Sequence, residues 1–242
     1  MQKRAVLLTR PKADAEESAA LLAARGFDTI IAPLLDIAIR AETPPLAGVQ
    51  ALLITSANGI RAFAQRSLRR DLAVFAVGEA SARAARELGF EAVESANGDV
   101  DDLAALVRRR LQPQAGRLLH PAGSTVAGDL AAQLSHSGFG VRRYVAYTAR
   151  SAHALPAAAR HALKEGAVSA VLLYSPRTAT IFRNLIDHAG HARDCHVVEA
   201  LCLSSAVAKA LAPLAFGRIR IAERPEQAAL FALLPDAAQQ TP

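Results

Sequence analysis

The sequence predicts an α/β protein made of two doubly wound, parallel-sheet lobes joined by two extended, strand-like links. Short β-branched or leucine-rich runs alternate with longer segments of helical period along the chain, which is typical of βαβ units. One plan is repeated in the two halves of the chain. Each half also contains an extended segment through which the chain can cross from one lobe to the other.

The strands are expected where short apolar runs are bounded by turn residues, and the helices where apolar residues recur with helical period. The expected strands are 5–9, 28–33, 51–55, 74–77, 117–120, 141–147, 170–174, 197–202 and 218–222. The expected helices are 13–25, 58–68, 79–89, 101–111, 125–137, 155–164, 177–188, 205–213 and 225–234. Gly26, Gly89 and Gly138 stand at the ends of expected helices, where a residue with positive φ is common.

The repeat consists of similar residues in the same order in both halves. Each copy has a leucine pair, a helix, a Gly-Phe pair and a strand, and later an apolar strand that ends in serine. The matched segments are 7–11 with 118–121, 26–27 with 138–139, 51–63 with 170–182 and, more weakly, 77–82 with 203–208. In the clearest match Phe63 and Phe182 stand 119 residues apart, as do Ser56 and Ser175.

Two extended segments, 34–40 and 141–150, decide how the copies combine into lobes. If the chain crosses at both, one lobe is continuous, 39–148, and the other combines 1–38 with 149–242. Each lobe then has about five strands, the size of a flavodoxin-like sheet. The alternative, two tandem lobes split near residue 115, leaves an incomplete sheet in each half.

Composition narrows the classes of function. Lys and Arg total 28 against 22 Asp and Glu, a net charge of +6, and all but four of these cations are arginine, whose planar fork suits carboxylate or phosphate. An anionic partner is expected, but not nucleic acid, because tryptophan is absent and aromatic residues are only 5%. No apolar run reaches the roughly 18 residues of a membrane span. Only two cysteines, Cys195 and Cys202, are present, so we expect a cytoplasmic protein with no membrane contact.

Candidate binding residues follow the predicted strands, where doubly wound sheets bind their ligands. Most are small residues near helix starts, whose backbone N–H groups suit an anion. The predicted binding residues are Thr9, Arg10, Thr55, Ser56, Asn58, Gly78, Ser81, His120, Pro121, Gly123, Ser175, Arg177, Thr178 and Ser204. Ordinary helix capping is the alternative for any one of them, whereas the set favours binding. Tyr147, at the end of the second link, can supply a proton or hydrogen bond, with packing as its alternative.

The sequence predicts no cofactor and no metal. Gly123 and Gly128 are followed by Asp129 instead of lysine, so this segment is not a P-loop. Neither a dinucleotide-binding glycine motif nor a nucleophile elbow is present. The histidines, aspartates and cysteine of 187–196 match no zinc spacing. Any reaction therefore has to use side chains and backbone alone.

The chain resembles the uroporphyrinogen-III synthase family in a series of motifs that extends from Val6 to Leu234. The motifs are Leu7-Leu8-Thr9-Arg10-Pro11, Thr55-Ser56-x-Asn58-Gly59, Val77-Gly78-Glu79-Ala80-Ser81, Leu118-Leu119-His120-Pro121, Val145-Ala146-Tyr147 and Tyr174-Ser175-Pro176-Arg177-Thr178. One segment departs from the family, which often has Gly-Pro followed by Ser or Thr where this chain has Ser204-Ser205-Ala206-Val207.

The resemblance implies two flavodoxin-like lobes with crossed connections and a hydro-lyase that needs no cofactor and acts as a monomer. Its substrate would be hydroxymethylbilane, a linear tetrapyrrole polycarboxylate. Its product, uroporphyrinogen III, would form with loss of water and inversion of ring D through a spiro intermediate. The resemblance also implies that Tyr147 helps the water leave and that backbone amides hold most of the substrate. Two alternatives fit two lobes: non-catalytic binding of a small polyanion, and regulation within a larger assembly.

Overall fold

The computed structural model describes residues 4–125 and 128–235, and contacts divide the chain into two compact units. Unit 1 combines Met1–Asp36 with Arg150–Pro242, and unit 2 is Ile37–Ala149. We propose that these units are the two lobes, which the sequence divides after residues 38 and 148.

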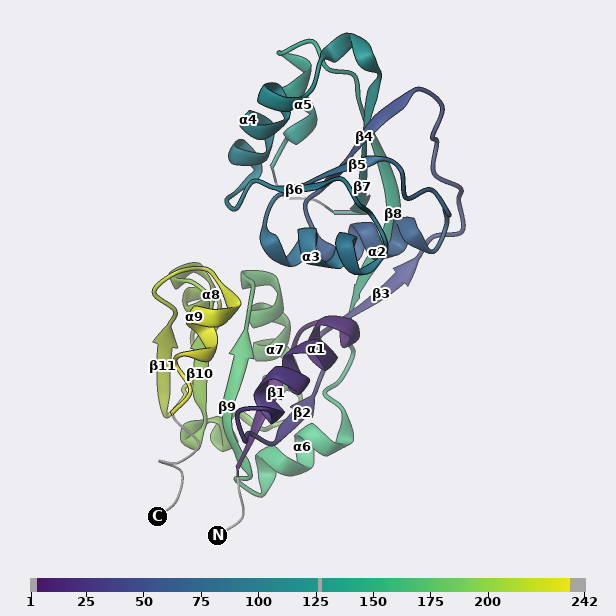
Figure 1. Cartoon of the computed structure of the whole chain (residues 1–242). Helices are drawn as coiled ribbons and strands as arrows, with labels where there is room; N and C mark the ends of the chain where they lie inside the picture. The colour runs from purple at the N-terminus through teal and green to yellow at the C-terminus, as the bar shows by residue number, and fades with distance from the viewer. Residues whose placement is uncertain (1–3, 126–127, 236–242) are drawn as a thin grey trace. The chain divides into compact units, whose positions relative to one another are not determined.

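Unit 1 is built, within its described residues, on a five-stranded parallel sheet in the order β2-β1-β9-β10-β11 (Figure 1). Its strands are β1 (Ala5–Leu8), β2 (Thr29–Ile31), β9 (Val168–Leu173), β10 (Glu199–Cys202) and β11 (Arg218–Ile221). Its helices are α1 (Lys12–Ala23), α6 (Ala157–Lys164), α7 (Pro176–His188), α8 (Ser205–Ala210) and α9 (Gln227–Phe231). Numbered along the unit, the strand order is 2-1-3-4-5, which is the flavodoxin-like order.

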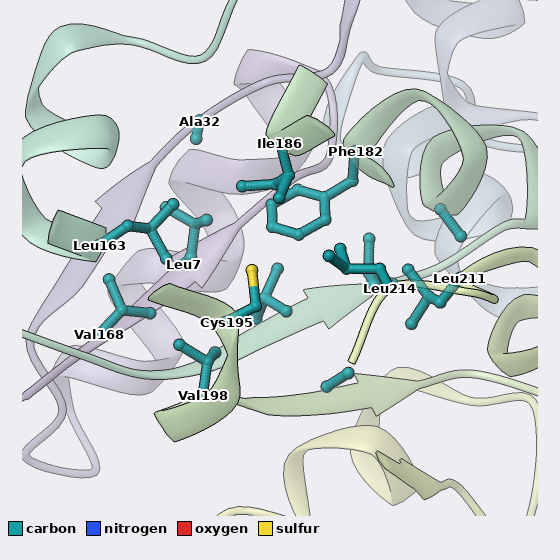
Figure 2. Close-up of a cluster of buried hydrophobic side chains, with 14 of the residues drawn as sticks. Leu7, Ala32, Leu163, Val168, Phe182, Ile186, Cys195, Val198, Leu211 and Leu214 are labelled. Carbon is teal, nitrogen blue, oxygen red and sulfur yellow. The ribbon is translucent and has the colours of Figure 1, made fainter. Parts of the chain in front are cut away.

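Both faces of the unit 1 sheet are covered, because successive side chains of a strand point to opposite faces. Leu7 of β1 belongs to a cluster with residues of α6, α7 and α8, among them Phe182 (Figure 2). Val6 and Leu8 belong to a second cluster with residues of α1 and α9, among them Phe231. Continuous apolar runs such as 5–8 therefore mark strands buried on both faces.

Unit 2 is built, within its described residues, on a six-stranded sheet in the order β3-β8-β7-β4-β5-β6 (Figure 1). Its strands are β3 (Leu35–Ile39), β4 (Val49–Ile54), β5 (Ala73–Ala76), β6 (Val93–Ser95), β7 (Arg117–Gly123) and β8 (Val141–Ser151). Helices α2 (Ala57–Ala64) and α3 (Glu79–Glu87) pack on one face around Phe63. Helices α4 (Val100–Arg110) and α5 (Leu130–Ser135) pack on the other face with Phe75.

The strand orders show which strands each copy of the repeat contributes to each unit. The first copy gives β1 and β2 to unit 1 and β4, β5 and β6 to unit 2, whereas the second gives β7 and β8 to unit 2 and β9, β10 and β11 to unit 1. The order β8-β7-β4-β5-β6 in unit 2 therefore matches β2-β1-β9-β10-β11 in unit 1. These strand orders are the arrangement that the crossed connection predicts, and we propose that the two lobes divide accordingly.

Both predicted links form strands, β3 and β8, which are hydrogen-bonded neighbours. Arg40 N–H donates to Ala146 O at 2.9 Å, and Ala152 N–H donates to Leu34 O at 3.0 Å. Residue numbers rise along one strand as they fall along the other, so this pair is antiparallel. On its other side β8 pairs with β7 in the parallel direction.

Among the elements that differ from the sequence prediction are β6, β10 and α5. β6 was not predicted, because its three residues are too few for a period to show. The strand predicted over 197–202 begins at Glu199, since a 3₁₀-helix precedes it. The helix predicted over 125–137 is shorter, and α5 begins after Asp129, whose carboxylate accepts from Ala132 N at 2.9 Å. Residues 126 and 127 of that prediction lie outside the described residues.

Strand β7 is also longer than predicted, since it continues past His120 to Gly123. β8 remains paired with it over this stretch and supplies its hydrogen bonds. β4 pairs with β7 only as far as Leu119, so the missing N–H of Pro121 costs no ladder bond on that side. Pro121 and Gly123, which the sequence places after the strand, therefore lie within it, as does His120, which the sequence places at its end.

Gly59 of α2 lies against the backbone of β7, where an added Cβ would stand 2.4 Å from Pro121 O. We expect Gly59→Ala to lower the free energy of unfolding by about 2 kcal/mol or more, because a strand carbonyl cannot move aside without shifting β7. Urea unfolding measures this. Gly78→Ala is the control, since nothing lies within 4 Å of that site, and it should cost about 1 kcal/mol or less. Equal losses would contradict the steric explanation.

Candidate active site

The predicted site residues gather at the carboxyl ends of the strands in their own unit. In each sheet the strand order reverses between two neighbours, β1 and β9 in unit 1 and β7 and β4 in unit 2, and doubly wound sheets bind ligands beside that reversal. Unit 1 holds Thr9, Arg10, Ser175, Arg177, Thr178 and Ser204, and unit 2 holds Thr55, Ser56, Asn58, Gly78, Ser81, His120, Pro121, Gly123 and Tyr147. The structure thus divides these residues between the carboxyl-end regions of the two units.

Thr9 ties the two central strands of unit 1 together. Its side chain is fully buried, and Oγ1 donates to Leu172 O of β9 at 2.6 Å. Its carbonyl accepts from Leu34 N at 3.1 Å. The Thr9 hydroxyl, which the sequence analysis assigns to ligand binding, therefore already donates a hydrogen bond within the sheet.

Arg10 is held by three groups of unit 1. Its guanidinium donates to Gln227 Oε1 at 2.6 Å, lies 3.2 Å from a carboxylate oxygen of Asp14, and stacks 4.8 Å from the ring centroid of Tyr174. The hydroxyl of Tyr174 is buried with no hydrogen-bond partner among the described residues, and burial raises its pKa. The Arg10 guanidinium is therefore already engaged within unit 1.

The hydroxyls of Ser175, Thr178 and Ser56 cap helices. Ser175 Oγ accepts from Thr178 N, and Thr178 Oγ1 accepts from Ser175 N, both at 3.2 Å, which closes a capping box at the start of α7. Ser56 Oγ accepts from Asn58 N at 3.2 Å at the start of α2. The capping alternative is confirmed for these hydroxyls.

Two other helix starts carry no side-chain cap. Gly78 precedes α3 and Ser204 precedes α8, and neither helix has a hydrogen bond from a capping side chain. Ser81, in the first turn of α3, is buried, whereas Arg177, in the first turn of α7, is exposed. At Gly78 the backbone is also unobstructed, since nothing lies within 4 Å of an added Cβ.

His120 and Thr55 join the two central strands of unit 2. Thr55 Oγ1 lies 3.0 Å from His120 Nε2, and the imidazole is only 5% exposed. Burial, together with the positive charge of Arg143, lowers the pKa of His120 to about 4. The imidazole is therefore neutral near pH 7 and can exchange hydrogen bonds without adding charge.

Tyr147 packs its ring against Gly123, its register partner on β7. A Cβ added at Gly123 would stand 3.0 Å from ring atoms of Tyr147 and 3.2 Å from its hydroxyl oxygen. The Tyr147 hydroxyl has no hydrogen-bond partner among the described residues. Among those same residues, Tyr174 Oη is the only side-chain polar atom that is both fully buried and without a partner, so the Tyr147 hydroxyl is not fully buried. The hydroxyl of Tyr147 thus keeps access to solvent although its ring is buried.

Arg143 is a polar residue of this region that the sequence analysis missed. It is the register partner of His120, and its Nη2 donates to Gly123 O at 2.6 Å and to Ser124 O at 2.7 Å. The available signal was an arginine pair, Arg142 and Arg143, inside a predicted strand that follows a proposed site strand.

Within residues 4–125 and 128–235, no three His, Cys, Asp or Glu side chains are placed to hold a metal ion. In the segment 187–196, His191 Nδ1 lies 2.6 Å from a carboxylate oxygen of Asp194, which is a local pair. No helix of the described chain combines the length and apolar character needed to cross a bilayer.

Comparison with known proteins identifies a family and similar solved structures. A family model described as "Uroporphyrinogen-III synthase HemD" matches residues 16–232. No curated protein sequence matches the chain. The chain is similar to the solved uroporphyrinogen-III synthetase of Helicobacter pylori 26695, with 16% identity over 95% of this chain and 97% of that one and a TM-score of 0.62. A mutant uroporphyrinogen III synthase of Thermus thermophilus shares 20% identity over 94% and 96%, with a TM-score of 0.47.

The low pKa of His120 makes the stability of the protein depend on pH. Between pH 7 and pH 4 the unfolded chain takes up a proton at its ordinary pKa of 6.5, whereas the folded chain binds it only near pH 4, so stability falls as the pH falls. We expect His120 to account for a loss of about 3 kcal/mol over this range. His120→Gln keeps a polar partner for Thr55 but cannot titrate. Urea unfolding at both pH values should show a smaller loss for this variant, and identical losses would contradict the assignment.

Proposed function

The chain belongs to the uroporphyrinogen-III synthase family of lyase-type enzymes, and on that premise we propose that it is a hydro-lyase that closes hydroxymethylbilane to uroporphyrinogen III. In this reaction water leaves the hydroxymethyl carbon, an azafulvene forms, and attack through a spiro intermediate inverts ring D before the ring closes. No electrons are exchanged with another reactant, so the chemistry needs acid-base groups and positioning and no cofactor.

Tyr147 is the group that we assign to the departure of water. Its hydroxyl has no hydrogen-bond partner among the described residues and keeps access to solvent, while its ring is fixed against Gly123, so it can present a proton or hydrogen bond to the leaving hydroxyl in one orientation. A hydrogen bond to that oxygen grows stronger as negative charge develops on it. This assignment is supported by the position of Tyr147 in both the family motif and the structure.

The larger task of the enzyme is conformational, since an electron-rich pyrrole loses water easily. Direct closure of the linear chain competes with the spiro path, and a hundredfold preference requires only about 2.7 kcal/mol. Charge-assisted hydrogen bonds contribute roughly 1.5 to 3 kcal/mol each, so a few of them can hold the two ends of the substrate in the required geometry. Binding of the substrate carboxylates is therefore the source of product selectivity.

We assign this binding to the predicted binding residues, with backbone groups ahead of hydroxyls. Helix α3 begins at Gly78 with no side-chain cap, so its first N–H groups can meet a carboxylate, and the positive end of the helix dipole favours one there. The hydroxyls of Thr9, Ser56 and Ser175 already have partners, and the caps also use the N–H groups of Asn58 and Thr178, so we propose recognition by the remaining N–H groups of these turns. At Ser204 the chain departs from the family motif, and only backbone recognition is proposed there.

We also propose that the protein acts in the cytoplasm as a monomer. Cys195 and Cys202 are buried thiols without a disulfide, and burial raises the pKa of both to about 12, so neither is a reactive thiolate. Unpaired cysteines suit a reducing compartment. Solution mass by light scattering tests the monomer.

The direct test is incubation of the purified protein with freshly generated hydroxymethylbilane, followed by oxidation and separation of the type I and type III uroporphyrin isomers. We expect predominantly type III, which reports both turnover and ring inversion. Only type I, the product of spontaneous closure, from demonstrably folded protein would contradict the proposed function. That outcome would favour the non-catalytic polyanion-binding alternative.

Substitution of two tyrosines of β8 distinguishes a catalytic role of Tyr147 from a packing role. We expect Tyr147→Phe to lower kcat by about a hundredfold, as for loss of a general acid, while the free energy of unfolding changes by no more than about 0.5 kcal/mol. Tyr144 is the matched control, because its hydroxyl donates to Glu42 O. Tyr144→Phe should cost about 1 kcal/mol of stability and leave kcat unchanged. Full activity of Tyr147→Phe would reduce that residue to a packing role.

A further inference from the structure

We propose that Arg143 binds a carboxylate of the substrate at the carboxyl end of β7 while it holds that strand end in place. The inference rests on the proposed function and deepens it, because it adds a recognition residue that the family motifs do not contain. All of the groups that carry it belong to unit 2.

The first step is the position of the guanidinium. Arg143 of β8 is the register partner of His120 of β7, and paired residues of neighbouring parallel strands project from the same face of the sheet. Its Nη2 donates to Gly123 O at 2.6 Å and to Ser124 O at 2.7 Å, beside the last residue of β7. These two bonds fix one end of the guanidinium at the edge where doubly wound sheets bind ligands.

The second step concerns the remaining N–H donors of the Arg143 guanidinium. A guanidinium carries five N–H donors, and those on Nε and Nη1 of Arg143 have no partner among the described residues. Arg143 also forms no ion pair in that part of the chain, and its side chain is exposed. Some arginines differ, since Arg86 lies 2.6 Å from Glu79 and Arg110 lies 2.8 Å from Glu94.

The third step is the chemistry around it. His120 of β7 has its Nε2 engaged with Thr55, and its neutral imidazole supplies no counter-charge to the Arg143 guanidinium. A substrate with several carboxylates supplies the missing counter-charge through a charge-assisted hydrogen bond. Since the same guanidinium also holds the carbonyls of Gly123 and Ser124, it fixes the bound carboxylate relative to Gly123, on which Tyr147 packs.

Steady-state kinetics with hydroxymethylbilane test the proposal. We expect Arg143→Ala to raise KM by about tenfold or more and to increase the share of type I product, because a charge-assisted contact is lost. Arg143→Lys should fall between this variant and wild type, since its donors stand on a single nitrogen that cannot serve the carbonyls and the carboxylate together. Arg142→Ala is the matched control, one residue earlier on β8 and on the opposite face of the sheet, and should stay within about twofold of wild type.

Two results would overturn the proposal. One is an Arg143→Ala variant whose KM and isomer ratio equal those of Arg142→Ala. The other is an Arg143→Lys variant whose KM and isomer ratio equal those of wild type. This second result tests the proposal if thermal melts show that Arg143→Ala is unfolded. Failure of the proposed function is distinguishable, because wild-type protein would then give only type I product. In that case binding of uroporphyrin III, a stable octacarboxylate, is followed by fluorescence, and equal affinity of wild type and Arg143→Ala would overturn the role of Arg143 separately.

Discussion

The pairing of β1 with β9 in unit 1 and of β4 with β7 in unit 2 is the interaction on which the rest of the structure depends. Each pair joins a strand of the first copy to a strand of the second, so neither copy can complete a sheet by itself. A lost pair would leave unpaired backbone groups in the middle of a sheet that is covered on both faces, which is costly. Side chains reinforce both pairs, through Thr9 to Leu172 O and through Thr55 to His120.

The same pairs explain where the free polar groups lie. Because the strand order reverses between the paired strands, helices leave on opposite faces and a ligand can approach the strand ends. Most hydroxyls at these ends are occupied by the fold itself, as Thr9, Ser175 and Thr178 show. Among the described residues, the groups that remain for chemistry are those without an internal partner, above all the hydroxyl of Tyr147 and the nitrogens Nε and Nη1 of Arg143.

Arginine serves the fold as well as the expected substrate. Arg70 donates to Leu88 O at 2.7 Å and stacks on Phe90, and Arg25 donates to Phe231 O at 3.2 Å. Exposed pairs such as Arg69 with Asp71 add little stability, because solvent screens them. The net charge of +6 therefore favours an anionic partner in general but does not identify the arginines that meet it.

The sequence by itself determined most of the elements, the two-lobed α/β fold and the resemblance to the family, because periodicity, repeats and motif order are properties of the linear chain. It located the strand ends at which the polar residues cluster. Only the tertiary structure decided which of those residues are occupied, because their partners are distant: Leu172 lies 163 positions from Thr9, and Gln227 lies 217 positions from Arg10. Arg142 and Arg143 are equivalent in the sequence, and only the register of β8 against β7 places Arg143 beside His120.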